Sequence, residues 1–181
     1  MPTARRSRTI AAPVEQLWDL ICDPHHLPRW WPRVMRVEDV DGGAFTEVMQ
    51  TKKGKWVRAD YDIVGVDEAE HVLTWEQRVD DTPFARLLSS AETELRLVAV
   101  TAAGSGGGQD AGTVPAQTLS DHGYTASATE VTIELRQTLA GYSPRFGILA
   151  GFSPRIGGYM VRRAAQDTLE QALDGLEQIS G

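Results

Sequence analysis

The sequence is poor in several residues whose abundance marks particular classes of protein. It has one cysteine, Cys22, among 181 residues, which excludes an internal disulfide framework and a cysteine-rich metal site. Its 18 Lys and Arg against 25 Asp and Glu give a formal net charge of -7, which argues against nucleic acid as a partner. No apolar run approaches the roughly 18 residues of a membrane helix, and the first residues do not resemble a signal peptide. We therefore expect a cytoplasmic protein without stable membrane insertion, folded as one domain over residues 1–181.

Helical periodicity predicts two main helices. The first begins at Pro13, because a proline in the first turn loses no needed donor, and it ends at Asp23-Pro24. The second is long and amphipathic, from about 156 to 179. Its apolar side is formed by Val161, Ala165, Leu169, Ala172, Leu176 and Ile179. Because its polar side becomes acidic rather than basic, we expect it to pack on a core and not on a membrane surface.

Alternation of apolar and polar residues predicts six strands. They cover residues 5–10, 45–50, 56–66, 72–79, 93–101 and 131–139. Arg5, Arg6 and Arg8 are interpreted as charges that keep an exposed first strand soluble. Segment 102–128 is rich in small and polar residues and is expected to be a flexible inserted loop.

This order of elements is typical of an α+β fold with its helices on one face of a sheet. A single helix of about 36 Å cannot cover both faces of the sheet, so the sheet must curl around it. We predict a curved antiparallel sheet of six to seven strands wrapped around the long C-terminal helix. Small residues on that helix, among them Gly157, Gly158 and Ala165, leave space for a ligand.

Residues near the start of the chain resemble those of a known superfamily. They are Ala12, Pro13, Glu15, Trp18, Asp23, Trp30 and Pro32. With the element order, they resemble the SRPBCC superfamily, which includes START lipid-transfer domains and polyketide cyclases and dehydrases. The resemblance covers nearly the whole chain outside 102–128. It implies a helix-grip fold with a deep, largely apolar cavity, but no single function, because this fold hosts carriers, enzymes and sensors.

A narrower resemblance concerns the segment from Arg78 to Ala85. It is similar to a strand end and turn of bacterial aromatase/cyclases, where an arginine precedes an acidic turn and Pro-Phe. The resemblance implies that Arg78 holds or polarises a carbonyl oxygen and stabilises an enolate. The strand at 61–66 lacks the second arginine of those enzymes, which departs from their pattern.

The predicted ligand-binding residues lie mainly on the apolar faces of the strands. Strand 72–79 leaves a choice, because adjacent residues cannot both face a cavity without a bulge. The apolar pattern favours Trp75 and Gln77 inward, with Arg78 as the alternative and the sole catalytic candidate. The full set is Trp30, Tyr61, Ile63, Trp75, Gln77, Arg78, Thr93, Leu95, Ile133, Gln137, Phe152 and Tyr159.

Other polar or aromatic features have less specific interpretations. Neighbouring His25 and His26 seldom converge on one ion, so neither a metal site nor a cofactor is predicted. Asp60 and Asp62 are interpreted as solvated charges on the outer face. Trp30-Trp31 either gates the cavity or packs the sheet end. An apolar lid formed within 146–152 is a further interpretation.

Two functions fit these patterns. The favoured one is binding or carriage of a hydrophobic small molecule such as a lipid, an isoprenoid or an aromatic polyketide. The alternative is a polyketide aromatase/cyclase or dehydrase that uses Arg78. A module that binds a protein partner through an outer sheet face with Trp56 is the third possibility. The residues identify neither the ligand nor a protein partner.

Overall fold

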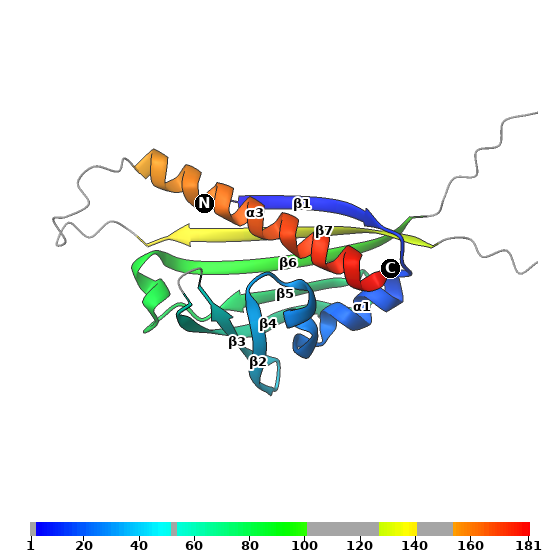
Figure 1. Cartoon of the computed structure of the whole chain (residues 1–181), viewed down its shortest axis with the longest axis horizontal. Helices are drawn as coiled ribbons and strands as arrows, with labels where there is room; N and C mark the ends of the chain where they lie inside the picture. Colours follow the sequence, from blue (N-terminus) through cyan, green and yellow to red (C-terminus); the bar gives the residue numbers. More distant parts are fainter. Residues whose placement is uncertain (1–2, 52–53, 101–126, 141–153) are drawn as a thin grey trace, which may run out of the picture.

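Seven strands and a long C-terminal helix dominate the described part of the chain (Figure 1). The computed structural model describes residues 3–51, 54–100, 127–140 and 154–181, with the backbone alone for Pro83 and for 154–160. The strands are β1 (Thr3–Ile10), β2 (Val34–Asp41), β3 (Ala44–Gln50), β4 (Trp56–Asp67), β5 (Val72–Gln77), β6 (Leu88–Val100) and β7 (Ala128–Leu139). The helices are α1 (Val14–Cys22), α2 (Leu27–Trp30) and α3 (Pro154–Ser180), with short 3-10 turns η1 (Pro24–His26) and η2 (Pro83–Arg86).

The strands form one antiparallel sheet in the order β1-β7-β6-β5-β4-β3-β2. β1 and β2 are therefore its two edges, and α3 runs along one face beside β1 and β7 (Figure 1). The predicted α+β helix-grip fold is confirmed. No helix in the described ranges is long and apolar enough to cross a membrane.

The sheet face that packs against α3, here called the inner face, follows the alternation read from the strands. Directly paired residues point to the same face, so the register fixes which side chains share it. Leu95 pairs with Leu73 and Ile133, and all three are buried against the leucines of α3. On β4 the inner residues are Val57, Ala59, Tyr61 and Ile63, as the sequence pattern predicts.

The opposite sheet face, the outer face, is covered by ion pairs. The Arg136 guanidinium binds Glu92, Glu94 and Glu134 from three positions on β6 and β7. Asp62 lies on this face, as expected for a solvated charge, and is bound by a nearby arginine. Trp56 is 56% exposed here, with the Arg36 guanidinium 5.5 Å from its ring centroid.

Strand β2 is the one strand that the residue pattern misses. It carries the charged residues Arg36, Glu38 and Asp39 with only brief alternation, and its register with β3 shifts twice. Asp39 has a positive φ of 53°, which also departs from regular strand geometry. Charges and bulges of this kind are common on edge strands, where they block pairing with other chains. The strand expected at 93–101 is also longer than predicted, since β6 begins at Leu88.

Helix α3 is fixed to the rest of the fold by its C-terminal half. Leu169, Leu173 and Leu176 are at most 1% exposed, so the predicted apolar stripe is confirmed. Gly175 lies directly against α2: a Cβ at this position would stand 2.5 Å from the Trp30 carbonyl oxygen. The absent side chain therefore permits the close approach of the two helices.

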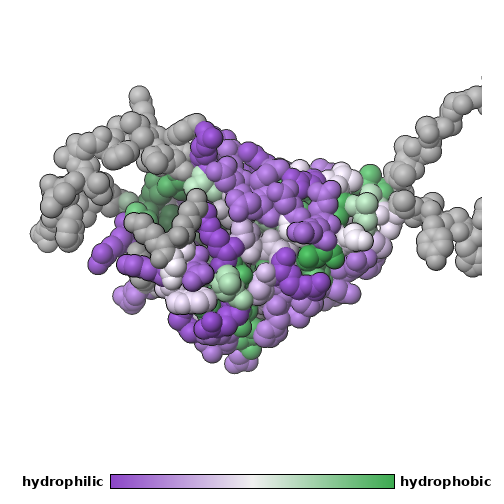
Figure 2. Space-filling view, in the orientation of Figure 1, coloured by the Kyte–Doolittle hydropathy of each residue, from purple (hydrophilic) through white to green (hydrophobic). Residues whose placement is uncertain are grey.

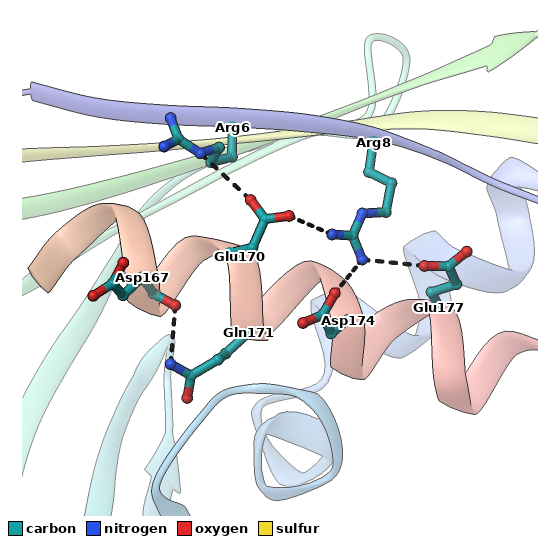
Figure 3. Close-up of polar contacts among 7 residues, drawn as sticks. All are labelled: Arg6, Arg8, Asp167, Glu170, Gln171, Asp174 and Glu177. Carbon is teal, nitrogen blue, oxygen red and sulfur yellow. Dashed lines mark hydrogen bonds and ion pairs between the residues drawn. The ribbon is translucent and has the colours of Figure 1, made fainter. Parts of the chain in front are cut away.

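Arginines of β1 hold the same half of α3 through charge (Figure 3). Arg8 binds Asp174, Glu170 at 2.5 Å and Glu177 at 3.1 Å, and Arg6 lies 3.4 Å from Glu170. β1 is an edge strand, but the interpretation of these two arginines as merely exposed charges is wrong. The polar side of the helix becomes acidic where it meets them.

We predict that Gly175→Ala destabilises the protein by about 1–3 kcal/mol, because the added methyl group forces α3 away from α2. An alanine within an ordinary helix would instead be stabilising by about 0.5–1 kcal/mol relative to glycine. The free energy of unfolding in urea measures the sign directly. Gln178→Ala, at an exposed position of the same helix, is the control and should change stability little. A stabilised Gly175→Ala protein would contradict the close contact.

Candidate functional site

The inner face is tightly closed at one end of the sheet and partly accessible at the other. Trp75, Leu95 and Ile133 are at most 2% exposed, under the anchored half of α3. Tyr61, Ile63 and Gln77 keep some accessible surface, although β4 and β5 are interior strands of the sheet. Side chains in the middle of a sheet retain such surface only where nothing packs fully on them. Among the described residues, these positions are therefore the less completely buried part of the inner face.

Aromatic rings form a continuous cluster across this boundary. The Phe45 and Tyr61 rings stack with centroids 5.1 Å apart, and Phe45 meets Trp75 edge to face at 6.2 Å. Trp31 contacts Trp75 at 5.8 Å and Trp30 at 5.4 Å, both edge to face. Rings in these geometries hold one another in fixed positions within the core.

A carboxyl group is buried beside this aromatic cluster. Glu47 lies on β3 with the same parity as Phe45, faces inward and is 1% exposed. Neither carboxyl oxygen has a hydrogen-bond partner among the described residues. Burial raises the pKa of Glu47 to about 8, and the neighbouring Tyr61 hydroxyl moderates the rise without completing a hydrogen bond. Glu47 is therefore mainly a neutral acid at pH 7.

The pKa of Tyr61 is raised well above 10, first by burial and then by the nearby Glu47. The phenol therefore stays protonated and available as a donor. Gln77, the cross-strand partner of Tyr61, has a buried Nε2 atom with no partner in the described chain. The buried indole Nε1 of Trp30 likewise has no hydrogen-bond partner in the described chain. A buried polar atom without a partner is costly, so these atoms are candidates for contact with a ligand.

A cleft of about 440 Å³ opens where β5 ends and β6 begins. Its size falls within the usual range for small-molecule sites. It is lined by Asp62, Glu76, Gln77, Arg78, Val79, Asp80, Ser89, Ser90 and Ala91. Figure 2 shows apolar surface (green) at the left, the end where α3 begins and β7 ends. The described residues that line a second cleft of about 380 Å³ are the polar Arg162, Arg163, Gln166 and Asp167 of α3.

The structure brings most of the predicted ligand-binding residues to one face. Trp75 and Gln77 lie on the inner face, as alternation favours. The others there are Tyr61, Ile63, Thr93, Leu95, Ile133 and Gln137, and Trp30 packs beside them from α2. Phe152, like the lid interpretation at 146–152 and almost all of segment 102–128, lies outside the described residues. So does the side chain of Tyr159.

Arg78 is the exception among these residues. Its guanidinium lies on the outer face and binds Asp62 through two contacts, the one from Nε being 2.5 Å. The pKa of Asp62 is lowered by this arginine. Arg78 still borders the cleft, because the cleft lies at the end of the strand. The inward placement kept as the alternative for Arg78 is therefore wrong.

Glu47 is the residue that sequence reasoning missed. The available signal was its position in the strand at 45–50: Glu47 is two residues from both Phe45 and Met49, so it faces inward as they do. Among other reactive groups, Cys22 is half-buried, and burial raises the pKa of its thiol to about 11. In the described ranges no three His, Cys, Asp or Glu residues come together as a metal site would require.

Comparisons with known proteins give a consistent assignment. A family model described as "Polyketide cyclase / dehydrase and lipid transport" matches residues 1–180. The fold is similar to the Zhui aromatase/cyclase from Streptomyces sp. R1128, with 15% identity, TM-score 0.63 and coverage of 98% of this chain and 92% of that chain. The fold is also similar to that of a START superfamily protein from Mycobacterium smegmatis, with 14% identity and TM-score 0.60. The match covers 98% of this chain and 96% of that chain.

The chain is also similar to the di-domain ARO/CYC BexL from the BE-7585A biosynthetic pathway, with 16% identity and TM-score 0.64. The match covers 98% of this chain but 46% of BexL, so the chain spans about half of that protein. No curated protein matches the sequence. At these identities the structural similarities establish the fold.

We predict that Glu47→Gln removes a specific pH dependence of stability. Between the ordinary value of 4.5 and the folded value of about 8, the unfolded chain has lost the Glu47 proton and the folded protein keeps it. The free energy of unfolding should therefore fall as pH rises through this window, by up to about 1.4 kcal/mol per pH unit. Urea unfolding at several pH values measures the slope.

The matched control for this measurement is Glu76→Gln, at an exposed position on the outer face. Its pH profile should follow that of the wild type, whereas the Glu47→Gln profile should be flatter. Parallel profiles for the wild type and Glu47→Gln would show that Glu47 titrates normally in the folded protein.

Proposed function

Because the chain belongs to the polyketide cyclase / dehydrase and lipid transport family, we propose that it binds a hydrophobic small molecule between the inner face and α3. The ligand enters at the end where β5 ends and β6 begins, beside Gln77 and Ala91. Its apolar part lies along the aromatic cluster, and its polar part meets Glu47, Tyr61 and Gln77.

The observation that carries this proposal is the set of buried polar atoms without partners. Both oxygens of Glu47 and the Nε2 of Gln77 are buried among apolar side chains on the inner face. A site that only stabilised the fold would gain from apolar residues at these positions, since unpaired buried groups cost free energy. Binding a ligand offsets that cost only in the occupied state. The polar groups thus serve recognition rather than folding.

An aromatase/cyclase activity is the second candidate function, and the structure offers observations for and against it. Arg78 borders the cleft, which the proposed enolate stabilisation requires. Its guanidinium is already bound by Asp62 on the outer face and would have to leave that carboxylate to reach a substrate. Glu47 offers a proton donor at neutral pH, but it has no second acid–base group of suitable pKa beside it in the described residues. Binding is therefore the better supported function.

We predict that Gln77→Trp weakens binding of the neutral apolar fluorophore N-phenyl-1-naphthylamine by about tenfold or more, because the indole fills the ligand entry at the end of β5. Fluorescence titration of the purified protein gives the dissociation constant. Val98→Trp places the same side chain at an exposed outer-face position of β6 that does not line the cleft, and it should leave the affinity within about twofold. Equal affinities for both variants, or no binding by the wild type, would contradict the proposed function.

A further inference from the structure

The charged side chains are distributed differently on the two faces of the sheet. On the outer face Arg58, Arg78 and Arg136 are each engaged by carboxylates. On the inner face the described strands contribute Arg6 and Arg8, and α3 binds both through Glu170 and its acidic neighbours. Glu47 is thus an acid whose charge no described cation of the protein balances.

This imbalance has a definite physical consequence for the ligand. Ionising a buried carboxyl group without a partner is expensive, so the empty protein keeps Glu47 protonated. A ligand with a second negative charge would add repulsion in the same apolar surroundings. A ligand with a positive charge would instead allow Glu47 to ionise as one member of a buried ion pair.

The aromatic cluster next to Glu47 points to the same ligand charge. Phe45 and Tyr61 lie on neighbouring strands beside it, and Trp75 follows on the next strand. Aromatic rings attract cations through their negatively polarised faces, and the attraction increases when water is excluded. They offer no comparable attraction to a carboxylate. Acid and rings together therefore make an environment that favours a cation with an apolar body.

We infer that the ligand carries a protonated amine, that Glu47 is its counter-ion, and that Glu47 excludes hydrophobic carboxylates such as fatty acids. This inference rests on the proposed function and adds the charge of the ligand to it. The proton balance is explicit: when an ammonium group binds below about pH 8, the O–H bond of the Glu47 carboxyl group breaks and its proton passes to the solvent. Glu47 acts here by setting specificity.

A series of probes with one chain length tests the inference. Decylamine, 1-decanol and decanoate differ only in their polar group, and each is measured by displacement of N-phenyl-1-naphthylamine. We expect the wild type to bind decylamine about tenfold or more tightly than 1-decanol, and decanoate most weakly. In Glu47→Gln the amine should lose about tenfold or more, and the three affinities should converge. Glu130→Gln, at an exposed outer-face position of β7 that does not line the cleft, is the control and should keep the wild-type order.

Calorimetry provides a readout that needs no variant of the site. Titration of the wild type with decylamine near pH 6.5, in buffers of different ionisation enthalpy, should show release of close to one proton per ligand. 1-Decanol should release none. Equal affinities for the amine and the alcohol, tighter binding of decanoate, or no proton release would overturn the inference while leaving hydrophobic binding intact. If N-phenyl-1-naphthylamine itself does not bind, the proposed function fails.

Discussion

The attachment of α3 by its C-terminal half is the constraint on which the rest of the structure depends. Buried leucines, the close approach at Gly175 and the charges around Arg8 all act on this half. They close the inner face over Leu95 and Ile133 and provide most of the core. The described side chains pack less completely at the other end of the sheet, where Tyr61 and Gln77 are half-buried.

Glu47 is the point at which local and global requirements disagree. A strand position facing a core favours an apolar side chain, and a carboxyl group there is costly unless it is paired. Real proteins break such local rules mainly at functional sites, where the cost is offset by recognition or chemistry. The raised pKa, the missing partners and the aromatic surroundings are consequences of one placement. They are the basis for proposing that a ligand binds at this end of the sheet.

The fold could be predicted from the sequence because its main elements have strong periodicities. Alternation on β4 and the apolar stripe of α3 depend on burial alone and were therefore readable, and the superfamily resemblance is confirmed. β2 could not be read because charges and bulges of an edge strand hide its period. The orientation of Arg78 depends on where β5 ends, and the burial of Glu47 depends on which side of β3 faces the core. Both are set by the pairing of strands and not by local sequence. That one domain covers residues 1–181 stays a prediction.

The central claim is that apolar space exists between the inner face and α3, and xenon binding tests it most directly. Xenon enters empty apolar cavities and needs no specific polar contact. A crystal of the protein pressurised with xenon should show the gas beside Tyr61 and Ile63, on the half-buried part of the inner face. If the crystal instead shows no xenon there, with ordered side chains filling the space down to Glu47, the interior is solid and the account is contradicted.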